Sequence, residues 1–252
     1  MHYICDDNLP TGAYQRGKLA AEHGNRYCLF NAPDTWTLSG SFLPLGYFIS
    51  RMVAYKVSKT GISEDYLDIL RKFIGELKDS PNFIKDLLYA VADDAGLTEN
   101  DTINMKGIDG FPATVTVKLI GTQYEQLVEN WEKNQKKINW ITAVIGDVGD
   151  LSLAANLTYF SLFGSDKNVV IFGHTHIVGM KKHYVLADAE EILGKHLDLP
   201  CRAIYANSGS WVDSVNSCTY VETEEDTNAG RHYVRVIAYP SKVVLKEGFV
   251  KL

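Results

Sequence analysis

The stretch that most constrains the fold is a short apolar run that ends in a glycine and two histidines, Val169–His176. Its first four residues, Val-Val-Ile-Phe, are continuously apolar and mostly β-branched, which predicts a strand buried on both faces of a sheet. Gly173 predicts that the backbone turns where this strand ends, and open α/β sheets bind ligands at the carboxyl ends of their strands. His174 and His176 then lie two residues apart beyond the strand. Both imidazoles can face one point, and neutral imidazole is the commonest transition-metal ligand.

An isolated His-x-His is, by itself, most simply a polar loop after a strand. A second strand-like run, Cys201–Ala206, changes this interpretation because it ends in Asn207-Ser208-Gly209-Ser210. Together the two strand ends resemble those of the calcineurin-like metallophosphoesterases. In that family Gly-His-Thr-His supplies the last two histidine ligands of a two-metal site, and an Asn-(Thr/Ser)-Gly-Ser loop closes the following strand. The resemblance implies that His174 and His176 are metal ligands and that Gly173 and Asn207 shape the loops around them.

A third histidine, His23, precedes a glycine at a break between two short apolar runs. An isolated histidine is more often a surface or core residue than a ligand. Beside the Gly-His-Thr-His motif, His23-Gly24 resembles the earlier His-Gly motif of the same family, which implies that His23 is a third metal ligand. Relatives often carry His or Asp at the position of Asn25 and Asp at that of Cys28. These two departures affect outer contacts more than they affect His23.

The sequence predicts an α/β fold with a helical insertion. Antiparallel strands are predicted near the carboxyl end of the chain, and residues 42–139 have the one-sided apolar spacing of helices. The resemblance implies that residues 1–41 and 140–252 form part of a metallophosphoesterase sandwich, in which β-sheets are flanked by helices. The helical insertion at 42–139 can then roof the site.

A Gly/Asp-rich string, Gly146-Asp147-Val148-Gly149-Asp150, follows another apolar run. It fits the pattern Gly-Asp-x-x-(Asp/Glu/His) in which the family carries its bridging aspartate. The family places that motif before the His-Gly motif, however, and here it comes long after His23. We therefore expect a loop that leads into a helix over Leu151–Phe163, with Asp150 near the positive end of that helix. Asp147 is not included among the metal ligands.

The other motifs of the family's first half, Asp-x-His and Gly-Asn-His, are absent upstream of His23. The resemblance then implies the carboxyl part of a catalytic domain, either by truncation or by evolutionary loss. Three neutral imidazoles offer no carboxylate to bridge two cations, so this chain is expected to hold one divalent ion or none. Manganese, iron, nickel and zinc all suit imidazole ligands. No catalytic residue beyond the ligands is assigned.

The function favoured by these features is that of a hydrolase, a metal-dependent phosphoesterase in which metal-activated water cleaves a phosphate mono- or diester. The expected substrate is a phosphorylated small molecule or a phosphodiester, and the chain alone is expected to be weakly active or inactive. The alternative is a non-catalytic binding or scaffold protein that retains a remnant of the fold. The Gly-His-Thr-His motif favours the first hypothesis, because a ligand loop explains it directly.

Composition limits the remaining possibilities. A chain of 252 residues that is 46% apolar can bury one good core and a small second one. A formal net charge of −6 does not indicate binding to nucleic acid or to an anionic membrane. Four scattered cysteines indicate free thiols in a reducing compartment, and no apolar run is long enough to span a membrane, so we expect a cytoplasmic protein. An incomplete sheet would expose strand edges and favour self-association.

Overall fold

The structure is a computed structural model that describes residues 13–32, 43–61, 66–108, 112–135, 138–160, 167–184, 201–210 and 218–252. The chain is mixed α/β and divides into two compact units, Met1–Gly24 with Gly149–Leu252 and Asn25–Val148. The sequence placed the corresponding boundaries at 41/42 and 139/140. The second unit therefore begins soon after His23 and extends to the Gly/Asp-rich string.

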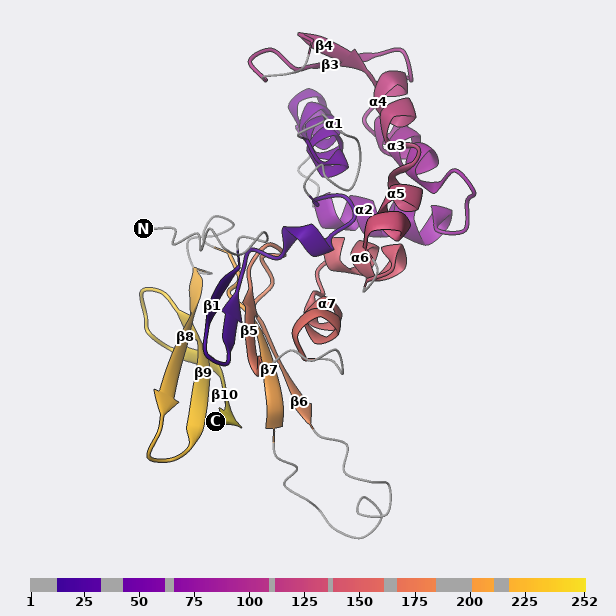
Figure 1. Cartoon of the computed structure of the whole chain (residues 1–252). Coiled ribbons are helices and arrows are strands. Elements are labelled where there is room, and N and C mark those ends of the chain that lie inside the picture. The colour runs from indigo at the N-terminus through magenta and orange to yellow at the C-terminus, as the bar shows by residue number, and fades with distance from the viewer. Residues whose placement is uncertain are drawn as a thin grey trace. The chain divides into compact units, whose positions relative to one another are not determined.

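The first unit contains two sheets and a short helix (Figure 1). The five-stranded sheet has the order β1-β2-β5-β7-β6, and the three-stranded sheet has the order β10-β9-β8. The elements are β1 (Tyr14–Arg16), β2 (Leu19–Ala21), α7 (Ser152–Ala155), β5 (Val169–Phe172), β6 (Gly179–Tyr184), β7 (Cys201–Asn207), β8 (Thr219–Asp226), β9 (Arg231–Ala238) and β10 (Val244–Lys251). A π-helical segment, Asn156–Phe160, continues α7.

The central strands of the five-stranded sheet, β5 and β7, are covered on both faces. One face packs against the three-stranded sheet through a fully buried cluster: Val169, Ile204, Ala206, Val234, Val236 and Val250. On the other face the rings of Phe172 and Tyr205 lie 5.6 Å apart, and Tyr159 of the π-helical segment packs on Phe172 at 6.3 Å. Because both faces are covered, β5 carries apolar residues without alternation. The prediction of a strand buried on both faces is confirmed.

Strand β5 is parallel to both of its neighbours. Ala21 of β2 lies opposite Ile171, and Asn207 of β7 lies opposite Phe172. The β2–β5 ladder continues past the strands, because the Gly173 N–H donates to the His23 carbonyl at 3.1 Å. The carboxyl ends of the three strands therefore meet at one edge of the sheet.

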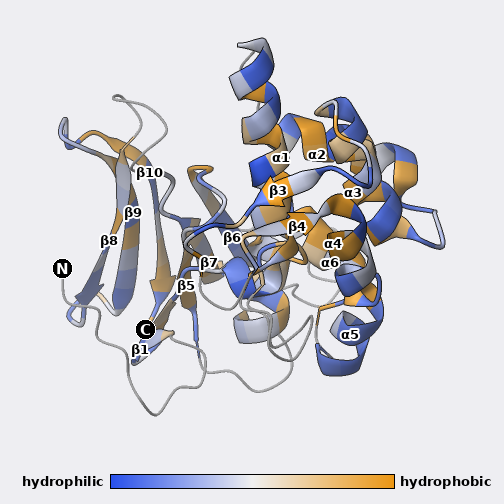
Figure 2. Cartoon of the chain, turned by 90° about the horizontal axis from the view of Figure 1, so that it is seen from above, coloured by the Kyte–Doolittle hydropathy of each residue, from blue (hydrophilic) through white to orange (hydrophobic). Residues whose placement is uncertain are grey.

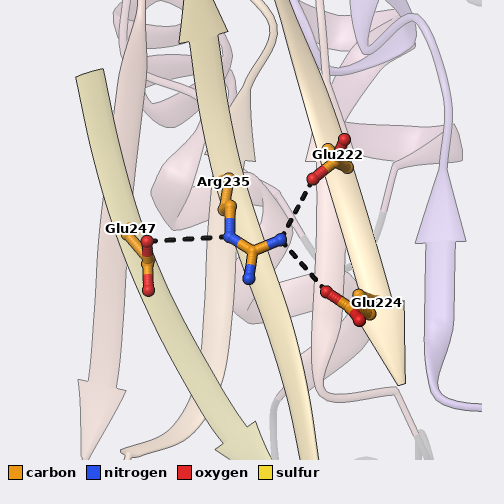
Figure 3. Close-up of polar contacts among 4 residues, drawn as sticks. All are labelled: Glu222, Glu224, Arg235 and Glu247. Atoms are coloured by element: carbon orange, nitrogen blue, oxygen red, sulfur yellow. Dashed lines mark hydrogen bonds and ion pairs between the residues drawn. The ribbon is translucent and has the colours of Figure 1, made fainter. Parts of the chain in front are cut away.

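The outer face of the three-stranded sheet is polar. Arg235 of β9 lies 3.0 Å from Glu222 and 3.1 Å from Glu224, both on β8, and 3.6 Å from Glu247 on β10 (Figure 3). Apolar residues face the core and charged residues face outward, as in other antiparallel sheets with one buried face. β10 is an edge strand of this sheet.

The second unit is mainly helical. Its helices carry hydrophobic and hydrophilic residues side by side (Figure 2), and Phe48, Leu87, Leu88, Tyr124 and Trp131 lie in its core. The elements are a 3₁₀ turn (Asn25–Tyr27), α1 (Leu45–Thr60), α2 (Tyr66–Leu77), α3 (Phe83–Asp94), β3 (Thr102–Asn104), β4 (Thr114–Thr116), α4 (Val117–Tyr124), α5 (Leu127–Asn134) and α6 (Trp140–Asp147). None of the helices described in either unit is long and apolar enough to cross a membrane.

The Gly/Asp-rich string differs from its prediction. Asp147 is the last residue of α6 and is buried, whereas a loop was expected there. Asp150 does lie at the start of α7, where its carboxylate accepts a hydrogen bond from the Ser152 N–H at 2.9 Å. Helical structure extends over Ser152–Phe160, and residues 161–166 lie outside the described residues.

Five strands were not predicted from the sequence. These are β1, β2 and β6 of the first unit and β3 and β4 of the second. β1 and β2 have only three residues each, too few to show an alternating pattern. β6 is an edge strand with Lys181 and Lys182 at its centre, and lysine is typical of edge strands. In each case pairing with a neighbouring strand outweighs local propensity.

We expect Gly24→Ala to destabilise the first unit by about 2 to 4 kcal/mol. Gly24 has a φ of 98°, and a Cβ there would lie 3.0 Å from Leu151 Cδ1 and 3.2 Å from Phe172 Cβ. Gly230→Ala is the matched control, because Gly230 has a φ of 62° and nothing within 4 Å of such a Cβ. Gly230→Ala should lower the free energy of unfolding only by the cost of a left-handed alanine, about 1 to 2 kcal/mol. If urea unfolding shows the same loss of stability in both variants, the side chains around Gly24 are not closely packed.

Candidate metal centre

The structure brings His23 and His174 together. Their ring centroids lie 5.0 Å apart at an interplanar angle of 72°. His23 is exposed and His174 is half-buried. Their proximity follows from the register of β2 and β5, because the two histidines continue adjacent parallel strands beyond the same edge of the sheet.

The loop that carries His174 and His176 has an unusual backbone. Both residues have left-handed conformations, with φ of 46° for His174 and 59° for His176. The Thr175 N–H donates to the Gly173 carbonyl at 2.6 Å, which closes a three-residue turn centred on His174. The sharp turn therefore falls on His174, whereas the sequence assigned it to Gly173. A left-handed non-glycine residue costs about 1 to 2 kcal/mol, and such residues concentrate at functional sites.

Asn207 holds this loop in place. It is buried, and its Nδ2 donates to the Gly173 carbonyl at 2.8 Å and to Thr175 Oγ1 at 2.9 Å. Its Oδ1 accepts from the Gly209 N–H at 3.0 Å. One amide therefore connects the end of β7 to the histidine loop. The loop-shaping role expected of Asn207 agrees with these contacts, and its amide is engaged by backbone and side-chain groups of the two loops.

The environment of His174 keeps its imidazole neutral. Burial lowers the pKa of His174 to about 4, with smaller contributions from the charges of His23 and His176. At neutral pH the His174 ring therefore has a free lone pair, which metal ligation requires. His176 is exposed, and its charge contributes to the lowering of the His174 pKa.

Two carboxylates of the first unit adjoin the elements that carry the histidines, and both have partners. Glu22, next to His23, accepts a hydrogen bond from the Tyr159 hydroxyl at 2.7 Å. Asp150 lies 2.5 Å from the Lys181 ammonium. The donor atoms brought together here are therefore imidazole nitrogens.

The second unit also contains two side chains that could bind a metal ion, Cys28 and Asp147. In the sequence, Cys28 was considered only as a departure from the His-Gly motif of the family, and Asp147 was not included among the predicted ligands. The signal that could have identified Asp147 is its place at the end of an apolar helical run, because that run buries its last side chain.

Comparison of the chain with protein-family models, with curated proteins and with solved structures found no match in any of the three.

Replacing Asn207 with alanine should destabilise the first unit by on the order of 3 kcal/mol, because a buried carbonyl and hydroxyl would lose their donor. Asn134→Ala is a suitable control, since Asn134 makes one exposed hydrogen bond, to the Asn130 carbonyl. That control should change the free energy of unfolding by no more than about 0.5 kcal/mol. A small effect of Asn207→Ala in urea unfolding would mean that water readily replaces its amide.

The metal-free chain should lose stability as the pH falls from 6.5 to 4. The pKa of His174 is lowered to about 4 in the folded chain, so the unfolded chain binds more protons in this window. The contribution is fully present above pH 6.5 and amounts to at most about 3 kcal/mol. His174→Ala should flatten the dependence, measured by urea unfolding with a chelator present. His23→Ala should retain most of it, because burial is the main cause of the shift. If the free energy of unfolding of His174→Ala depends on pH as strongly as that of the unmodified chain, the lowered pKa does not belong to His174.

Proposed function

We propose that this chain is a metal-dependent phosphoesterase of the calcineurin-like type, in which His23, His174 and His176 bind a divalent cation. The observation that carries the proposal is the convergence of His23 and His174 beyond the ends of two adjacent parallel strands. These histidines come from distant parts of the sequence, and their order along the chain is that of the family's motifs. The left-handed backbone of the histidine loop supports the same conclusion.

The residues present suit one divalent ion. Two imidazoles within 5.0 Å can direct ring nitrogens at one point, and the lowered pKa of His174 leaves its ring unprotonated at neutral pH. Exposure of His23 and His176 leaves the site open to solvent and substrate. Imidazole ligands favour manganese, iron, nickel or zinc over magnesium or calcium.

When bound, such an ion lowers the pKa of coordinated water and polarises a phosphoryl oxygen. The protein residues position the ligands. The β2–β5 ladder fixes the backbone of His23 against Gly173, and Asn207 fixes the loop from which His174 and His176 project. The carboxylates of Glu22 and Asp150 are engaged by Tyr159 and Lys181. The proposed site thus has neutral ligands, and we expect one ion to be held more readily than two.

The test is hydrolysis of an aryl phosphate and an aryl phosphodiester by the full chain with added manganese. We expect slow turnover that requires the metal and falls by about two to three orders of magnitude in His23→Ala and in His174→Ala, since each removes a ligand. His183→Ala is the control, because His183 lies on β6 outside the histidine loop. It should retain the activity of the unmodified chain.

Two results would overturn the proposal. Turnover that survives both His23→Ala and His174→Ala would place the chemistry elsewhere. Failure of the unmodified chain to bind manganese, nickel or zinc by calorimetry, together with no turnover, would favour a binding or scaffold protein that retains the fold without the activity.

A further inference from the structure

A buried thiol and a buried carboxylate lie side by side in the second unit. Cys28 is 0% exposed and Asp147 is 5% exposed, and the Cys28 Sγ lies within 4.8 Å of a carboxylate oxygen of Asp147. One zinc ion bound to both atoms at tetrahedral angles would need a separation of roughly 3.6 Å, given typical Zn–S and Zn–O bond lengths. A small side-chain rotation would cover the difference.

The Asp147 carboxylate is already oriented by neighbouring donors. The Phe30 N–H donates to Oδ2 at 2.8 Å, and Asn31 Nδ2 donates to Oδ1 at 2.7 Å. The Leu29 N–H also donates toward this carboxylate and lowers its pKa. Carboxylates that bind metals are commonly held by such outer hydrogen bonds, and each oxygen keeps a lone pair for a ligand.

The segment that contains Cys28 is fixed against α6. The Cys28 carbonyl accepts from the Ala32 N–H at 2.8 Å, and the Leu29 N–H donates to the Ala143 carbonyl at 3.4 Å. Ala143 and Asp147 are four residues apart, so they lie on one face of α6. Backbone contacts therefore hold the thiol and the carboxylate in fixed positions, as a preorganised site requires.

Among the residues that the structure describes, this acidic pair has no lysine or arginine partner. The other groups that influence the Asp147 carboxylate are neutral N–H donors. A buried carboxylate of this kind binds a proton or a cation. The neighbouring thiol makes a cation the more specific partner, because a thiolate and a carboxylate together can neutralise a divalent ion.

We propose that Cys28 and Asp147 bind a divalent cation of the zinc class, with Asn31 as a residue that positions the carboxylate. Thiolate ligands select zinc over magnesium, calcium or manganese. The pair belongs to the second unit and is not part of the histidine ligand set of the proposed phosphoesterase site.

Cobalt(II) is the probe, because cobalt–thiolate bonds give a near-ultraviolet charge-transfer band that imidazole ligation does not give. The metal-free full chain should develop this band on titration, and zinc should displace it. Cys28→Ser should abolish the band. Asp147→Asn should weaken cobalt binding at least tenfold, and Asn31→Ala by about 10- to 100-fold, as for other outer-shell partners. Cys201→Ser is the matched control and should keep the band.

The proposal fails if the band is absent from the unmodified chain or persists in Cys28→Ser, which would assign the band to another thiol. Urea unfolding of each variant separates loss of binding from loss of fold. If Cys28→Ser does not fold, cobalt binding by Asp147→Asn and Asn31→Ala is the test. Unchanged affinity in both variants would contradict the proposal. Failure of this proposal can be distinguished from failure of the phosphoesterase proposal, because manganese-dependent turnover should be retained in Cys28→Ser.

Discussion

The candidate metal centre depends on the parallel pairing of β5 with β2 and β7. With Ala21 opposite Ile171 and Phe172 opposite Asn207, the three strands end within one residue of one another, and His23, Gly173 and Ser208 lie just beyond their ends. Because successive strand residues face opposite sides, a shift of one residue between β2 and β5 would direct His23 to the other face of the sheet. The buried cluster around Val169 and Ile204 opposes such a shift, since it would expose the apolar residues that the two sheets share.

The histidine loop shows how the surrounding protein can stabilise an unfavourable backbone. Two left-handed residues in three, His174 and His176, cost about 1 to 2 kcal/mol each. Asn207 offsets part of this cost, because its buried amide donates on both sides of His174, to Gly173 and to Thr175. The favourable hydrogen bonds are made by a residue of a different strand, so the loop conformation depends on the assembled sheet and would not persist in the isolated peptide.

The sequence predicted the parts of the fold that have strong local patterns. The run at 169–172 indicated a doubly buried strand, and the one-sided apolar spacing indicated the helices of the second unit. β2 could not be predicted, because three residues carry no periodicity and its pairing partner is distant in the sequence. The proximity of His23 and His174 was expected only from the order of the motifs. The burial of Asp147 was missed because a Gly/Asp-rich string resembles a loop, whereas here it includes the last turn of α6.

The contacts of Asp147 with Phe30 and Asn31 also bear on how the chain folds. They join the beginning of the second unit to its end, so the folded helical unit holds its own two ends together. β2 and β5 belong to the first unit but flank the whole of Asn25–Val148 in sequence. Closing a flexible loop of that length would cost on the order of 4 kcal/mol of chain entropy. If the helical unit folds first, most of that cost is already met, and β2 pairs with β5 as though the two strands were separated by a short connection.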